Sequence, residues 1–494
     1  MPGSAQGVVA AGHPHTAEAG AAVLRTGGNA VDAAIAAMLT SFACEPLLTG
    51  LGAGGYMLVA GFDEPPALLD FFVESPGRQA GGAPPREPLL PFEVDFGDAS
   101  QLFHAGAASC GVYGVPAGVC AALARWGTVQ LAALAAPAAE LARSGVELNH
   151  EQAYVAEILE GILTSTPECA ALWAPRGEIL REGELLRDPA LGDALELLAE
   201  EGSRPFYRGE PARRVCEAIA ERGGTLGAAD LAGYEAFLRE PTEVAYRDRT
   251  ILTNPPPSAG GTLLAYSLSL LARAPGPPSL AAVVAAMEAA QSERTPQFLE
   301  GLRQPNFLDN FLASRLGSTT HISVLDGSGR ACSVTCTNGE GSGIVVPGTG
   351  IHVNNIMGEQ DLNPLGFHLQ EPGQRMPSMM APTLVLDADS RVELVLGSAG
   401  SNRIRSALLQ TIVGAVDGAL SALEAISAPR VHIEDGVLYA EPGIDTRALE
   451  RPGLEVARFH APNLFFGGVQ AVQRRGSQLA GAGDPRRGGV AVSA

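Results

Sequence analysis

The chain has 494 residues, of which 46% are apolar and only 18% are charged. This composition supplies ample material for a large buried core, so it excludes a chain that is disordered over most of its length. The net charge of −21 argues against a nucleic-acid partner, because an acidic surface repels phosphate backbones.

The N-terminal part of the chain predicts two helices followed by a hairpin. Helical periodicity runs over residues 16–44 and is broken at the glycine pair 27–28, with Asn29 well placed as the N-cap of the second helix. Residues 56–59 have the apolar character of a buried strand, and residues 67–72 are the expected hairpin partner.

A glycine-rich loop lies between that helix and that strand. Gly50, Gly52 and Gly55 match the G-x-G-x-x-G spelling of a dinucleotide site. The motif works only when a strand precedes it and a helix follows, because the helix N-terminus binds the pyrophosphate. The order here is the reverse, so we expect a turn packed closely against neighbouring backbone.

The middle of the chain is mostly helical, and its last third is rich in strands. Helices are expected near residues 117–126, 131–144, 151–163, 212–222, 261–272 and 279–290, with strand-like residues at 243–252. The polar residues 292–318 predict an exposed connector. Strand patterns then follow at 321–325, 330–337, 343–346, 383–386, 392–396, 437–441 and 454–457, around a helix at 403–416. This division predicts a layered α+β protein.

Four ordered stretches carry a resemblance to a known family. They are residues 27–34 with 45–46 and the glycine loop; 206–209, 230–234 and 255–261; 319–321, 347–351 and 354–355; and 374–383, 397–403 and 428–430. Together they span nearly the whole chain and resemble the gamma-glutamyltransferases, in which they occur in the same order.

The resemblance implies an N-terminal-nucleophile hydrolase fold, a four-layer αββα sandwich of two antiparallel sheets between helical layers. It also implies self-cleavage between Ser318 and Thr319, at the end of the polar connector. The products would be a large segment, residues 1–318, and a small segment of 176 residues, 319–494, which stay together as a heterodimer and form one αββα unit.

Thr319 is the expected nucleophile. A threonine hydroxyl needs a base, and the α-amine that cleavage frees on the same residue can serve, since it titrates near 7.7–8.0 in model peptides. The resemblance implies that Thr337 orients the nucleophile and that the backbone N–H groups of Gly400 and Ser401 form the oxyanion hole. The family usually has two glycines there, but a backbone donor survives the change to serine.

The positions that bind the glutamate carboxylate in the family are altered. Phe72 stands where arginine is expected, and of two adjacent serines only Ser378 remains, with Met379 in place of the other. Losing an arginine and a serine removes charge-assisted hydrogen bonds of about 1.5–3 kcal/mol each. An alternative stays open, in which another arginine, Arg78 or Arg375, supplies the charge.

The ammonium-binding positions are altered as well. Asn338 lies near the first of them, Ile356 occupies the second, and Glu359 keeps the negative charge of the third. Together with Phe72 and Met379, Ile356 predicts an acyl pocket that is more apolar than the family norm.

Three functions therefore remain open. The first is a self-processing γ-glutamyl amidohydrolase or acyltransferase acting on small molecules such as glutathione. The second is the same threonine chemistry on a less charged acyl amide, as in relatives that hydrolyse oxamate or acylated β-lactams. The third is an unprocessed, non-catalytic binding relative. None of them requires a metal or an organic cofactor.

The sequence also favours a cytoplasmic protein. The N-terminus has no basic start and no sustained apolar run, and no apolar stretch reaches the length of a membrane span. The seven cysteines are odd in number and widely scattered, which favours reduced thiols over a disulfide framework.

Overall fold

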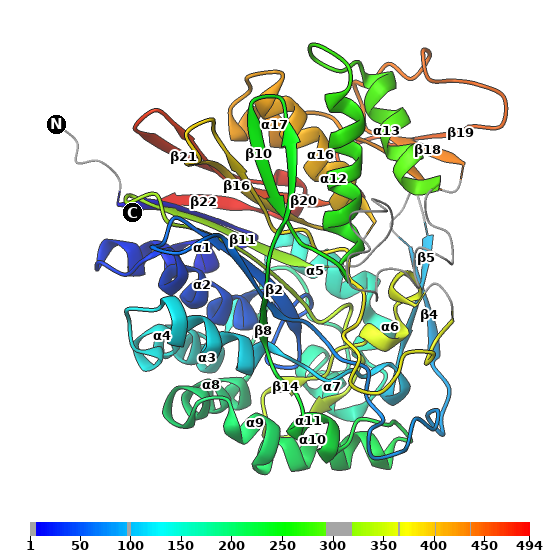
Figure 1. Cartoon of the computed structure of the whole chain (residues 1–494). Helices are drawn as coiled ribbons and strands as arrows, with labels where there is room; N and C mark the ends of the chain where they lie inside the picture. The colour runs from blue at the N-terminus through cyan, green and yellow to red at the C-terminus, as the bar shows by residue number, and fades with distance from the viewer. Residues whose placement is uncertain (1–5, 96–99, 293–318, 364–365, 401, 435) are drawn as a thin grey trace.

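A computed structural model describes residues 6–95, 100–292, 319–363, 366–400, 402–434 and 436–494 (Figure 1). The fold is mixed α/β with two large antiparallel sheets. In spatial order the seven-stranded sheet consists of β22 (Val490–Ser493), β1 (Gly7–Ala11), β11 (Thr320–Asp326), β12 (Ala331–Thr337), β2 (Gly54–Ala60), β3 (Ala67–Phe71) and β8 (Phe237–Arg239). The six-stranded sheet consists of β21 (Gln478–Gly483), β20 (Gly468–Arg475), β16 (Val392–Ala399), β15 (Thr383–Leu386), β10 (Arg249–Thr253) and β9 (Thr242–Tyr246).

The two sheets face each other, with β11 and β12 lying on β16 and β20. Helices cover the outer face of each sheet (Figure 1). The seven-stranded sheet carries α1 (Pro14–Arg25), α2 (Ala30–Cys44) and α3 (Val115–Trp126), with α4 (Leu131–Ser144) and α8 (Pro189–Glu201) packed outside them. The six-stranded sheet carries α12 (Ala259–Ala272), α13 (Leu280–Ser292), α16 (Arg403–Val416) and α17 (Ala422–Ser427).

The apolar core falls into three large clusters that follow this layering. One joins the seven-stranded sheet to its helices, and a second joins the six-stranded sheet to its own. The third lies between the sheets, where Tyr56 and Leu58 of one meet Leu384 and Val395 of the other. Each sheet therefore buries both faces, which explains why its strands are apolar over their whole length.

Shorter elements complete the chain. The helices are α5 (His150–Ile158), α6 (Glu160–Leu163), α7 (Pro167–Trp173), α9 (Arg204–Arg208), α10 (Glu210–Glu221) and α11 (Ala228–Ala232). Small sheets pair β4 (Leu90–Asp95) with β5 (Ser100–Ala105), β6 (Val146–Glu147) with β7 (Leu185–Leu186), β13 (Val345–Val346) with β14 (Ile351–His352), and β17 (Val431–Glu434) with β18 (Val437–Ala440) and β19 (Glu455–Arg458). Within the described ranges, no helix has the length and apolarity needed to cross a membrane.

The predicted break between the first two helices is confirmed. The Asn29 side chain accepts hydrogen bonds from the N–H groups of Val31 and Asp32, and Asp32 returns one to the N–H of Asn29, which completes a capping box. α2 is buried along its whole length because it lies between the sheet and α4. An apolar helix surface without a polar face is the pattern expected of such a position.

The glycine loop is a closely packed turn, as predicted. A Cβ atom on Gly52 would lie 2.2 Å from the carbonyl oxygen of His352, so no larger residue fits there. β2 follows the loop and pairs with β3, which confirms the hairpin. The sequence analysis missed β1, which is short and Ala-rich but lies near the centre of its sheet. The predicted connector, residues 292–318, lies outside the described residues after Ser292.

Candidate active site

Thr319 directly precedes β11, a central strand of the seven-stranded sheet. The residue is 1% exposed, and its Oγ1 atom has no hydrogen-bond partner among the described residues. β11 and β12 pair Thr320 with Cys336, so the same register continued by one residue places Thr319 opposite Thr337. Buried hydroxyls are usually satisfied, and one that is not marks a site where a further group can bind.

Thr337 ends β12 and is tied to the turn that follows. Its Oγ1 atom accepts a hydrogen bond of 2.8 Å from the N–H of Gly339. Gly339 has φ 61°, and a Cβ atom there would lie 2.0 Å from Asn355 Oδ1 and 2.5 Å from Glu359 Oε1. The turn therefore requires glycine and brings the carboxylate of Glu359 close to the end of β12.

Asn338 is held by the loops around it. Its side-chain Nδ2 donates to the carbonyl of His352 at 3.2 Å, and its backbone N–H donates to the carbonyl of Leu48 at 2.9 Å. The residue is completely buried. Its amide side chain thus fixes the turn after β12, and a role in substrate binding stays a prediction.

Gly400 follows β16 and faces the same region from the other sheet. It has φ 117°, and a Cβ atom on it would lie 2.5 Å from Gly467 Cα, so this position requires glycine. Its carbonyl accepts the N–H of Arg403 at 2.9 Å at the start of α16. Ser401, the other predicted oxyanion residue, lies outside the described residues, as does Ser318.

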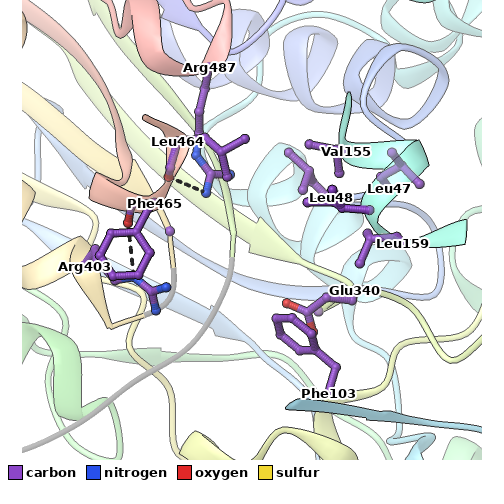
Figure 2. Close-up of a pocket in the computed structure, with 13 residues that line it drawn as sticks. Leu47, Leu48, Phe103, Val155, Leu159, Glu340, Arg403, Leu464, Phe465 and Arg487 are labelled. Atoms are coloured by element: carbon purple, nitrogen blue, oxygen red, sulfur yellow. Dashed lines mark hydrogen bonds between the residues drawn. The ribbon is translucent and has the colours of Figure 1, made fainter. Parts of the chain in front are cut away.

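A cavity joins these two turns (Figure 2). Gly339 and Gly400 both line it, and it encloses about 580 Å³ of empty space, part of which is open to solvent. Its other lining residues are Leu47, Leu48, Phe103, Val155, Ile158, Leu159, Glu340, Arg403, Leu464, Phe465 and Arg487. A neighbouring cavity shares Leu47, Leu48, Val155, Leu464 and Arg487 with it and reaches Glu45.

Glu45 is a buried carboxyl group beside the nucleophile that the sequence analysis did not identify. Its Oε1 accepts a hydrogen bond from Thr320 Oγ1 at 3.0 Å, and its Oε2 accepts one from Thr16 Oγ1 at 3.1 Å. Burial raises its pKa to about 7, although both threonines and Arg487 oppose this shift. One signal was available, because Glu45 caps the C-terminus of α2, where the helix dipole disfavours an acid.

Glu45 makes stability depend on pH in a direction opposite to that of most acids. Its pKa in the folded protein, about 7, lies above the ordinary value of 4.5, so the folded state holds the proton more tightly. Stability should therefore fall as pH rises from about 4.5 through about 7, by an amount on the order of 3 kcal/mol. The variant Glu45→Gln lacks this contribution. We expect its apparent Tm, relative to wild type, to rise between pH 5 and pH 8; a difference that does not change with pH would contradict the assignment.

His321 lies two residues beyond Thr319 on the same face of β11. Its ring nitrogens contact Thr335 Oγ1 at 2.7 Å and Ser323 Oγ at 2.9 Å, between the two sheets. Burial lowers its pKa to about 3, so the ring is neutral at physiological pH. His321 therefore links β11 to β12 and does not supply a positive charge to the site.

The comparisons with known proteins agree with this geometry. A model of the family described as gamma-glutamyltranspeptidase matches residues 16–307 and 304–494. The acylase ACY 1 proenzyme of Pseudomonas sp. (strain SE83) is 31% identical, over 94% of this chain and 89% of the relative. The glutathione hydrolase proenzyme of Escherichia coli (strain K12) is 30% identical, over 97% and 90%.

The chain belongs to the gamma-glutamyltranspeptidase family. It is an enzyme of the N-terminal-nucleophile hydrolase type, like the glutathione hydrolases and acylases that it resembles. The crystal structure of cephalosporin acylase from Bacillus halodurans has the same fold, with a TM-score of 0.83 at 24% identity over 99% of this chain and 96% of that one.

The positions that bind glutamate in this family are packed with apolar side chains. Phe72 and Ile356 are completely buried in the cluster between the two sheets, where Phe72 stacks on Tyr56 at 5.4 Å. Met379 is equally buried but belongs to the cluster between the six-stranded sheet and its helices. The three residues thus do not form one pocket, although Phe72 and Ile356 share a cluster. Ser378 Oγ accepts the N–H of Met380 at 3.0 Å.

Neither alternative arginine has a free guanidinium. Arg375 is 8% exposed, donates to the carbonyl of Phe72, and pairs with Asp70 at 3.3 Å and Glu74 at 3.6 Å. Arg78 pairs with the other oxygen of Glu74 at 3.2 Å. Both arginines neutralise buried carboxylates, so a substrate carboxylate would have to compete with Asp70 and Glu74 for them.

Proposed function

We propose that this protein is a self-processing amidohydrolase in which Thr319, freed by cleavage after Ser318, attacks the carbonyl of an amide substrate. The observation that carries the proposal is the buried Thr319 hydroxyl, which has no partner among the described residues and lies at the start of a central strand. The expected register with Thr337 and the shared cavity at Gly339 and Gly400 support it.

The processing step needs only groups of the chain. Thr319 Oγ attacks the carbonyl carbon of Ser318, the peptide bond breaks, and its nitrogen takes a proton to become the free α-amine of Thr319. Water then hydrolyses the ester that remains. The products are segments of 318 and 176 residues. The names of the acylase and glutathione hydrolase relatives describe them as proenzymes, which supports this step.

Turnover repeats the same chemistry on the substrate. The α-amine of Thr319 removes the hydroxyl proton, and the oxygen attacks the amide carbon to give a tetrahedral oxyanion. Backbone N–H groups at Gly400 and Ser401 would stabilise that charge. The amine half leaves with the transferred proton, and water or a second amine releases the acyl group from Thr319.

We also propose that the layers form the four-layer αββα sandwich of this superfamily. Two facing sheets, helices on both outer faces and three apolar clusters support that description. β1, β2, β3 and β8 precede residue 319, whereas β11, β12 and β22 follow it, and they alternate within one sheet. The two segments therefore share ladder hydrogen bonds, which favours a heterodimer that stays together after cleavage.

A second candidate concerns the acyl group, and the packing at Phe72 and Ile356 favours it. Both side chains are completely buried where the family binds glutamate, so a γ-glutamyl group would place its α-carboxylate and α-ammonium against hydrocarbon. Burying charges without partners is strongly unfavourable. We propose that the preferred acyl group is less charged than γ-glutamate.

Mass spectrometry of the acyl-enzyme tests both parts of the proposal. The mature protein is mixed with p-nitroanilides of γ-glutamate, acetate, butyrate and phenylacetate, quenched in acid within one turnover, and digested. We expect an acyl mass on the peptide that begins at Thr319, and faster p-nitroaniline release from the neutral acyl groups. Turnover with the acyl mass on another residue would overturn the nucleophile; a preference for γ-glutamyl would overturn the acyl assignment.

A further inference from the structure

Arg487 is a buried cation in the cavity beside the proposed nucleophile. It ends η5 (Pro485–Arg487), and its Nη2 donates to the carbonyl of Leu464 at 3.2 Å (Figure 2). Its Nε has no hydrogen-bond partner among the described residues, and no carboxylate there lies within ion-pair distance of it. A buried guanidinium without a counter-ion is costly, so this position is suited to an anion from outside the chain.

The charges around Arg487 also favour an anion. Burial lowers its pKa to about 10, and Arg403 lowers it further, while Asp484, Glu340 and Glu45 act in the opposite direction. A pKa near 10 leaves the guanidinium protonated at neutral pH. Asp484 is already paired with two other arginines, Arg430 at 2.7 Å and Arg486 at 3.1 Å, so it is not free to neutralise Arg487.

Arg487 lies within reach of the proposed reaction centre. A Cβ atom built on Gly400, the proposed oxyanion residue, would lie 3.6 Å from Arg487 Nη2. Between Arg487 and the outer wall, the cavity is lined by hydrocarbon from Leu47, Leu48 and Val155 (Figure 2). A ligand bound here would have its anion on Arg487 and its apolar body on these side chains.

The cavity lies on the side of Thr319 away from the altered glutamate positions. Phe72 follows β3, three strands from β11 in the direction of β12 and β2. Arg487 follows β21 and packs against the start of β20, which lies over β11 and β1. An amide attacked at Thr319 would therefore extend its acyl half toward Phe72 and its amine half toward Arg487.

We propose that this cavity binds the amine half of the substrate and selects amines that carry a carboxylate, which pairs with Arg487. The proposal rests on the amidohydrolase function, and it adds the class of the leaving amine, an amino-carboxylate with an apolar body. The same cavity would favour such amines as acceptors when the acyl group is transferred.

A matched pair of leaving groups tests the proposal. The substrates are the butyryl amides of 4-aminobenzoate and 4-aminobenzamide, which differ in charge but hardly in size. We expect wild-type kcat/KM to be about 10- to 100-fold higher for the carboxylate, the range of one charge-assisted hydrogen-bonded pair. Arg487→Gln should remove this preference and leave the benzamide substrate within about threefold of wild type. Arg487→Lys should retain part of it.

Controls separate this proposal from the function on which it rests. The exposed Arg447, which pairs with Asp445 on the surface, serves as the matched control, and Arg447→Gln should change neither substrate. Equal wild-type rates, or an equal loss on both substrates in Arg487→Gln, would overturn the Arg487 assignment while leaving the amidohydrolase intact. An absence of Thr319-dependent turnover would instead overturn the amidohydrolase.

Binding of the free amines to the wild-type protein needs neither a variant nor turnover. We expect 4-aminobenzoate to bind at least tenfold more tightly than 4-aminobenzamide by calorimetry, and to lose that advantage at high salt, because screening weakens a pair that is partly open to solvent. Equal affinities would overturn the proposal.

Discussion

Thr319→Ala should yield a single uncleaved chain of about 51 kDa that has no amidase activity. The variant lacks the oxygen that attacks both the Ser318 carbonyl and the substrate, and without cleavage the α-amine that acts as base is never freed. Loss of a nucleophile and its base lowers kcat by a factor on the order of 10⁵ to 10⁶. Denaturing electrophoresis after long incubation, together with p-nitroanilide turnover, measures both effects.

Thr319→Ser is the matched control. It keeps a hydroxyl at the same atom, so the chain should still cleave into segments of 318 and 176 residues and should retain part of its activity. Because Thr319 is buried at the end of a strand, the alanine variant loses one methyl and one hydroxyl and should fold. A cleaved and active alanine variant would contradict the proposed chemistry outright.

Asp484→Ala should be the most destabilising of the substitutions considered, by about 3–5 kcal/mol. Asp484 is completely buried and pairs with Arg430 at 2.7 Å and Arg486 at 3.1 Å, and it also accepts the N–H of Val469 at 2.9 Å. Removing it leaves two buried guanidinium groups that share one remaining carboxylate, Glu441. The apparent Tm and the urea midpoint should both fall.

The exposed pair of Asp445 and Arg447 provides the comparison for that prediction. Both side chains are mostly in solvent, and such pairs contribute about 0–1 kcal/mol. Asp445→Ala should therefore leave the Tm nearly unchanged. If Asp484→Ala behaved in the same way, the buried cluster would not hold the C-terminal segment, and with it Arg487, in place.

Local physics made much of the fold predictable. Asn29 caps a helix because its side chain meets N–H groups two and three residues away, and Gly52 marks a turn because no Cβ fits there. Both signals act over a few residues and can be read from the chain. β1 could not be read in this way, since its five residues become a strand by pairing with β11 and β22, more than 300 residues distant in sequence.

The sequence by itself determined the family, the candidate nucleophile Thr319 and the loss of the usual glutamate-binding residues, because each of these depends on residue identity at a position. Tertiary structure alone decided which charges are free. It committed Arg375 to Asp70 and Glu74, buried Glu45 against Thr320, and left Arg487 without an acid in the cavity beside Gly400. Pairing and burial depend on neighbours brought together by the sheets, and those neighbours are far apart in sequence.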